Sequence, residues 1–119
     1  MQEAPPSGLK VSTRSSGDVH VIDAEGRVTL GPGATALRRA LDGAAGKHPK
    51  TLLNLGQVSY IDSAGLGELV GGFTAIRNRG GQLRLVRPTR RVKELLQITG
   101  LVKVFDIYDE EAAAVRSFG

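Results

Sequence analysis

The chain has 119 residues, 40% of them hydrophobic, and a formal net charge of +4; this is the size and composition of one globular domain with a real core. The absence of cysteine excludes disulfides, thiol chemistry and cysteine-ligated metal sites. No N-terminal apolar run resembles a signal peptide, and no stretch approaches the roughly 20 apolar residues of a membrane helix, so we expect a cytoplasmic protein without membrane insertion.

Strand and helix patterns alternate along the chain after a polar start. Residues 1–8 contain two prolines and a glycine, so we predict a flexible N-terminal segment followed by one domain at 9–119. In chain order the predicted elements are strands at 9–13 and 19–24, the latter continued at 26–28; a helix with apolar positions 37, 40, 41 and 44; a strand at 51–61; a helix with apolar positions 66, 69, 70, 73 and 76; a strand at 82–86; a helix with inward positions 92, 95, 96 and 99; a strand at 104–108; and an alanine-rich final helix. An initial hairpin followed by alternating helices and strands predicts an α/β fold, with a mixed sheet of four to five strands and about four helices.

Three of these helices begin with a residue that can cap them. Asp62, Thr89 and Asp109 each precede a helical pattern, and a side-chain oxygen at that position accepts a hydrogen bond from the first turn. We predict that each caps the helix that follows. Gly100 is a good helix-ending residue for the third helix.

The stretch from Tyr60 to Val70 carries the strongest functional signal. A buried-looking strand runs into it and an amphipathic helix leaves it, so Ser63 stands at a strand-to-helix corner and at a helix N-terminus. Gly65 and Gly67 lie just behind it. This geometry would present Ser63 to another protein and leave room for a phosphoryl group.

A hydrolase nucleophile is a possible alternative role for Ser63, but its surroundings do not favour it. The sharp-turn signature needs glycine two residues before and two residues after the serine. Gly65 is present, whereas Ile61 stands where the first glycine should be. Only His20 and His48 could act as bases, and neither has an orienting partner in sequence. We therefore predict no catalytic residue.

Glycine patterns and histidines indicate nucleotide or metal sites only weakly. Gly65-Leu66-Gly67 with Gly71 follows a strand, but the spacing is not that of a dinucleotide loop and the next strand ends in Arg87 rather than an acid. The run 43–47 is two residues too short for a phosphate loop, and His48 replaces the required Ser or Thr. Two isolated histidines without an acid cluster make a poor metal site, so we predict no metal and no cofactor.

Seven basic residues fall in one segment without an intervening acid: Arg77, Arg79, Arg84, Arg87, Arg90, Arg91 and Lys93. Such a segment can attract nucleic acid, lipid or an acidic protein. RNA recognition usually adds exposed stacking aromatics, and no aromatic lies inside this segment. We expect no direct nucleic-acid binding, which leaves a solvated surface or a role in orienting an acidic partner.

The segment Ile61-Asp62-Ser63-Ala64-Gly65-Leu66-Gly67 resembles the signature of the STAS domain, specifically that of the bacterial anti-sigma factor antagonists. The resemblance runs from about residue 9 to 118. It includes the strand Leu83-Arg84-Leu85-Val86, the helix Val92-Lys93-Glu94-Leu95-Leu96 and the turn Gly100-Leu101.

This resemblance implies a partner switch rather than an enzyme. The family's unphosphorylated members bind an anti-sigma factor that is also a serine kinase, and so release its sigma factor. Phosphorylation of the serine matching Ser63 ends the binding, and a serine phosphatase resets it. The implied partner-binding residues are Asp62, Ser63, Ala64, Gly65, Leu66 and Gly67. Two alternatives remain: a structural STAS module, in a stress-sensing scaffold or as a soluble subunit of a lipid transporter, and a small nucleotide-binding protein.

Overall fold

Five strands form one mixed sheet in which the strand order follows the chain, β1-β2-β3-β4-β5. The computed structural model describes residues 8–119, so most of the predicted flexible segment lies outside the described residues. The elements are β1 (Leu9–Ser16), β2 (Val19–Val28), α1 (Pro32–Ala44), β3 (Lys50–Ile61), α2 (Ser63–Asn78), β4 (Gln82–Val86), α3 (Arg90–Ile98), the short 3₁₀ helix η1 (Leu101–Lys103), β5 (Asp106–Tyr108) and α4 (Glu111–Ser117). Strands β1 and β2 pair antiparallel and the other pairs are parallel. The predicted α/β fold, with an initial hairpin and about four helices, is confirmed.

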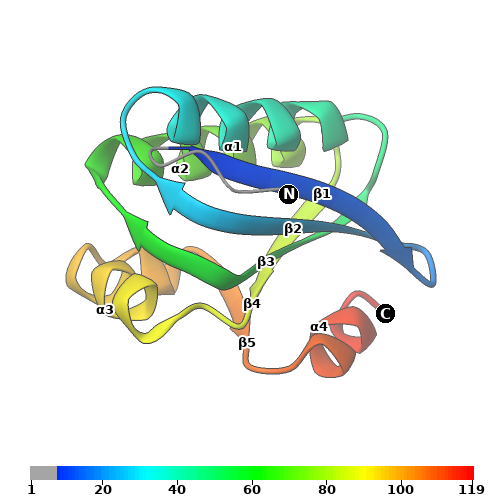
Figure 1. Cartoon of the computed structure of the whole chain (residues 1–119). Coiled ribbons are helices and arrows are strands. Elements are labelled where there is room, and N and C mark those ends of the chain that lie inside the picture. Colours follow the sequence, from blue (N-terminus) through cyan, green and yellow to red (C-terminus); the bar gives the residue numbers. More distant parts are fainter. Residues whose placement is uncertain (1–7) are drawn as a thin grey trace, which may run out of the picture.

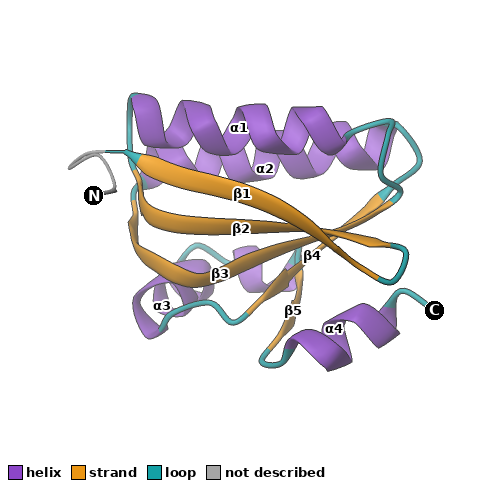
Figure 2. Ribbon diagram, turned by 45° about the vertical axis from the view of Figure 1, so that its right-hand side comes forward, coloured by secondary structure: helices purple, strands orange, loops and turns teal. Residues whose placement is uncertain are grey.

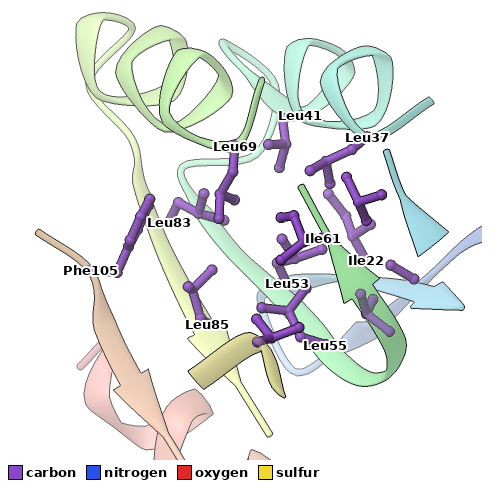
Figure 3. Close-up of a cluster of buried hydrophobic side chains, with 14 of the residues drawn as sticks. Ile22, Leu37, Leu41, Leu53, Leu55, Ile61, Leu69, Leu83, Leu85 and Phe105 are labelled. Carbon is purple, nitrogen blue, oxygen red and sulfur yellow. The ribbon is translucent and has the colours of Figure 1, made fainter. Parts of the chain in front are cut away.

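The helices lie in two layers, one on each side of the sheet. Helices α1 and α2 lie side by side over one face, whereas α3 and α4 lie below the other (Figures 1 and 2). Along β3, Leu53 and Leu55 join the larger core shown in Figure 3, whereas Leu52, the residue before Leu53, belongs to a smaller core under α4. This alternation follows from the two-residue period of a strand that is covered on both faces.

The end of the chain differs from the sequence-based prediction in three places. Thr99, predicted to face inward, is exposed, because α3 ends at Ile98 and the Thr99 hydroxyl donates back to the Leu95 carbonyl at 2.8 Å. The last strand begins at Asp106 rather than at residue 104, since the chain first makes the 3₁₀ turn η1. The predicted cap from Asp109 is also wrong: Glu110 occupies the N-cap position of α4 and makes no side-chain capping bond.

Helix α4 is fastened to the opposite edge of the sheet by Arg14. The Arg14 guanidinium donates to Glu111 of α4 at 2.6 and 2.9 Å and to Asp23 of β2 at 2.7 Å. These bonds to Arg14 hold the pKa values of both Glu111 and Asp23 below their usual range. Charge-assisted bonds in a fork are the stronger kind of surface contact, and they supplement the small apolar contact that Ala114 makes in the core under α4.

Two histidines far apart in the chain stack on each other. The rings of His20, in β2, and His48, in the loop before β3, have centroids 3.8 Å apart at an angle of 6°. His48 is therefore half-buried, not in solvent as its loop position suggests. Burial, and secondly the charge of His48, lower the pKa of His20.

This stacked pair predicts a loss of stability in mild acid. Because the pKa of His20 is lower in the folded state, the unfolded state binds more protons as pH falls from 7 to 5.5, and stability decreases over that window. Between pH 7 and 5.5, the Tm of His20→Gln should therefore fall by about 2 °C less than the Tm of the unaltered chain. Thermal melts followed by circular dichroism at several pH values test this. His48→Gln removes both the neighbouring charge and the ring stacked on His20, so its fall in Tm should also be smaller than that of the unaltered chain. Parallel curves for the unaltered chain and His20→Gln would contradict the prediction.

Candidate partner-docking site at the Ser63 corner

Asp62 builds the corner between β3 and α2. Its backbone is extended, and its side chain accepts from the Gly65 amide at 2.8 Å and from the Leu30 amide at 3.0 Å. The predicted N-cap is therefore confirmed. These amide donors hold the pKa of Asp62 below its usual range, so its carboxylate is ionised at neutral pH. The bond from Leu30 also ties the loop between β2 and α1 to the start of α2, a contact that the sequence does not indicate.

The predicted docking residues fall into an exposed and a buried group. Ser63, the first residue of α2, and Gly67 are exposed, and Asp62 and Ala64 are half-buried. Gly65 and Leu66 are buried. The first group can touch a partner directly, whereas the buried pair can only shape the surface from beneath.

The two glycines of the corner have different reasons to be glycine. A Cβ at Gly65 would collide with the Val28 carbonyl oxygen and lie 2.8 Å from the side chains of Val28 and Ile61. A Cβ at Gly67 would meet nothing within 4 Å. Gly65 therefore lets α2 approach the end of β2 closely. Gly67 leaves the surface beside Ser63 without a projecting side chain.

A groove of about 400 Å³ runs between the start of α2 and α3. Ser63 and Asp62 line one side, and Arg91, Glu94, Leu95 and Ile98 line the other. Ile98 is 81% exposed, and Leu30, whose amide bonds Asp62, is 79% exposed. Exposed apolar side chains thus flank Ser63 on both sides, an arrangement typical of a protein–protein contact site.

Tyr60 lies against two arginines at the end of this groove. The guanidinium carbon of Arg91, from α3, is 5.2 Å from the centre of the Tyr60 ring, and that of Arg27, from β2, is 5.6 Å away. Both distances are within the range of cation–π attraction. An irregularity in the β2–β3 pairing shifts the register so that Arg27 stands opposite Tyr60.

The basic segment 77–93 does not form one stripe. Arg77 lies on α2, Arg84 on β4 and the last three on α3, whereas Arg79 and Arg87 lie in the connections between these elements. Arg77 lies on the ring of Phe73 and Arg84 on that of Phe118. Phe73 is one turn before Arg77 on α2, and Phe118, at the end of α4, is brought to Arg84 by the tertiary fold; each ring holds one arginine in place.

The geometry does not support a hydrolase site at Ser63, nor the metal and phosphate-loop sites that the sequence weakly indicates. Both histidines lie near the start of β3, and Ser63 follows its end, about 35 Å away for an extended strand of 12 residues. Within residues 8–119, no three His, Asp or Glu side chains group as metal ligands. The phosphate-loop-like run 43–47 is the ending of α1, with Gly46 at φ 81°. No helix in the described part is long and apolar enough to span a bilayer.

Comparison with known proteins assigns the family. The STAS domain model matches residues 10–114. The chain belongs to the STAS domain family. It is 36% identical to the anti-sigma-B factor antagonist of Bacillus subtilis over 83 residues, 70% of this chain and 76% of that one. With the anti-sigma-B factor antagonist of Listeria monocytogenes it shares 41% identity over 59 residues, 50% of this chain and 52% of the relative.

A solved structure of the family has the same fold. The crystal structure of an anti-sigma factor antagonist from Mycobacterium paratuberculosis superposes with a TM-score of 0.84 and covers 97% of each chain. The two sequences are 21% identical. The STAS architecture, with its opening hairpin and four helices, is therefore shared by this chain.

Proposed function

We propose that this STAS protein is an anti-sigma factor antagonist whose binding is switched off by phosphorylation of Ser63. The unphosphorylated form binds a serine-kinase anti-sigma factor, which then releases its sigma factor. A serine phosphatase restores the unphosphorylated form. The protein acts in the cytoplasm as a single domain over residues 9–119, as ligand and substrate rather than as an enzyme, and makes no direct contact with nucleic acid.

The observation that carries the proposal is the exposed Ser63 hydroxyl at the first position of α2, with exposed apolar side chains on both sides. A kinase must reach the hydroxyl, and Ser63 is exposed where Gly67 offers no side chain to obstruct an approaching protein. Leu30 and Ile98 supply apolar contact area on either side of it. The relatives named anti-sigma-B factor antagonists support the identity of the partner.

The transfer itself needs no group from this chain other than the serine. The Ser63 Oγ attacks the γ-phosphorus of ATP bound to the kinase, and the bond from that phosphorus to the bridging oxygen of ADP breaks. A base on the kinase takes the hydroxyl proton. The product carries about −1.5 to −2 additional charge at neutral pH.

That charge falls where a docked partner would exclude water. The phosphoryl group would lie next to the ionised Asp62, whose carboxylate is held by the Gly65 and Leu30 amides. Like charges brought together at an interface cost several kcal/mol, so the partner would dissociate without any unfolding of the STAS domain.

Capture and phosphate mapping test this proposal. Ser63→Ala, which cannot be phosphorylated, should retain an anti-sigma factor from a lysate of the source organism, and adding the variant should free a sigma factor from that complex. Capture of transporter subunits or scaffold proteins instead would favour the structural alternative. A bait that retains no anti-sigma factor would sink the proposed function.

With the captured kinase and Mg-ATP, we expect phosphate on Ser63 alone. Ser59 is an internal control, since it is also exposed but its hydroxyl donates to the Gly26 carbonyl at 3.2 Å. Peptide mapping by mass spectrometry should find one phosphorylated peptide in the unaltered chain and none in Ser63→Ala. Phosphate on Ser59, or none with a kinase that is active on itself, would contradict the assignment.

A further inference from the structure

We propose that Arg91 is the intramolecular receptor for the phosphoryl group on Ser63. This inference rests on the proposed function, because it concerns the phosphorylated form of the same corner. Arg91 on α3 and Ser63 on α2 line the same groove from opposite sides. The guanidinium of Arg91 lies on Tyr60 at the end of that groove, so it can swing into it without moving the backbone.

Among the described residues, Arg90 has a carboxylate partner and Arg91 has none. Arg90 pairs with Glu94, one turn further along α3, at 3.6 Å. No carboxylate within residues 8–119 forms an ion pair with Arg91 or with Arg27. Two guanidiniums on one ring repel each other, and a phosphoryl group that draws one of them away would relieve that repulsion.

The start of α2 does not meet the needs of the phosphate by itself. A helix N-terminus attracts anions through its free amides. Here the carboxylate of Asp62 already accepts from the Gly65 amide and carries a negative charge beside Ser63. A phosphate with three acceptor oxygens therefore needs a cation, and the planar fork of an arginine matches it in a two-point contact.

Binding of the phosphoryl group by Arg91 would change the docking surface, because the Arg91 side chain would move. When Arg91 turns from Tyr60 to the phosphorylated Ser63, its side chain crosses the groove between α2 and α3. The apolar floor at Leu95 is then covered, and partner release gains a steric part in addition to charge repulsion. Arg27 remains on Tyr60 and keeps the ring in place.

Phosphorus NMR on the full chain with genetically encoded phosphoserine at position 63 tests the receptor directly. An arginine that binds the dianion lowers the second pKa of the phosphate. That pKa should be lower in the otherwise unaltered chain than in Arg91→Gln by about 0.5 unit, and raised salt should shrink the difference. Arg91→Lys, which keeps the charge but not the fork, should retain part of the shift.

Arg90→Gln is the matched control, because it removes the same charge from the adjacent position of the same helix. It should leave the phosphate pKa unchanged. Equal pKa values in the unaltered chain and Arg91→Gln would overturn the proposal, as would an equal shift in Arg90→Gln. Because the phosphoserine is encoded, this outcome is independent of whether a kinase is found, so the two proposals fail separately.

Discussion

Replacing Ser63 with aspartate should weaken binding to the anti-sigma factor at least about 100-fold, which corresponds to about 2.7 kcal/mol. The added carboxylate would lie beside the ionised Asp62 and at the centre of the proposed docking surface. A like charge forced into a contact that excludes water costs energy of this size. Ser63→Ala adds no charge and should bind as well as the unaltered protein. Titration calorimetry on the purified pair measures both affinities.

A charge change elsewhere provides the control for this experiment. Ser12 is exposed on β1 and lines a polar groove with Asp23 and Asn54, residues that do not line the groove beside Ser63. Ser12→Asp adds the same charge and should leave the affinity within about twofold, because a distant exposed charge is screened. Equal affinities of Ser63→Asp and Ser63→Ala would place Ser63 outside the interface.

Gly65→Ala should be the most destabilising single-methyl change at the corner, by about 3 kcal/mol. The new methyl group would collide with the Val28 carbonyl oxygen, which is backbone and also accepts a hydrogen bond from the Asp62 amide at 3.2 Å. Overpacking that a flexible side chain can relieve costs about 1–3 kcal/mol, and a backbone neighbour leaves little room for relief. Urea denaturation of the purified variants measures the change in the free energy of unfolding.

Gly67→Ala separates packing from recognition. Its methyl group meets nothing within 4 Å, and alanine is the better helix former, so the free energy of unfolding should stay equal or rise by about 0.5 kcal/mol. The same variant should nevertheless weaken partner binding, because its methyl group projects from the proposed docking surface next to Ser63. Gly65→Ala as stable as Gly67→Ala would show that α2 can move away from β2 at little cost.

Local sequence pattern was sufficient to predict the order of the elements and the caps of the two helices that line the groove, α2 and α3. The two-residue period of strands and the 3.6-residue period of helices depend only on neighbours in the chain, and they predicted a sheet of four to five strands and about four helices in the order that the structure has. Asp62 and Thr89 cap α2 and α3 as predicted, because a capping side chain reaches only three residues ahead. The position of Ser63 at an exposed corner followed from the same local signals.

Where tertiary contacts compete with local preference, the sequence was a weaker guide. Glu111 is held by Arg14, 97 residues earlier in the chain, and α4 begins without a cap from Asp109. The last strand could pair over only three residues, since η1 turns the chain beforehand. Both outcomes depend on where another element stands, which no local pattern records.

The sequence by itself determined the fold class, the corner and the serine on it; only the tertiary structure decided what surrounds that serine. Leu30 reaches Asp62 because β2 and β3 are neighbours, and Arg27 stands opposite Tyr60 because of an irregular register. Arg91 and Ile98 line the groove because the crossover after β4 returns α3 to the end of β3. The physical reason is that such contacts join segments about 30 residues apart, and their geometry is set by strand pairing and helix packing rather than by nearest neighbours.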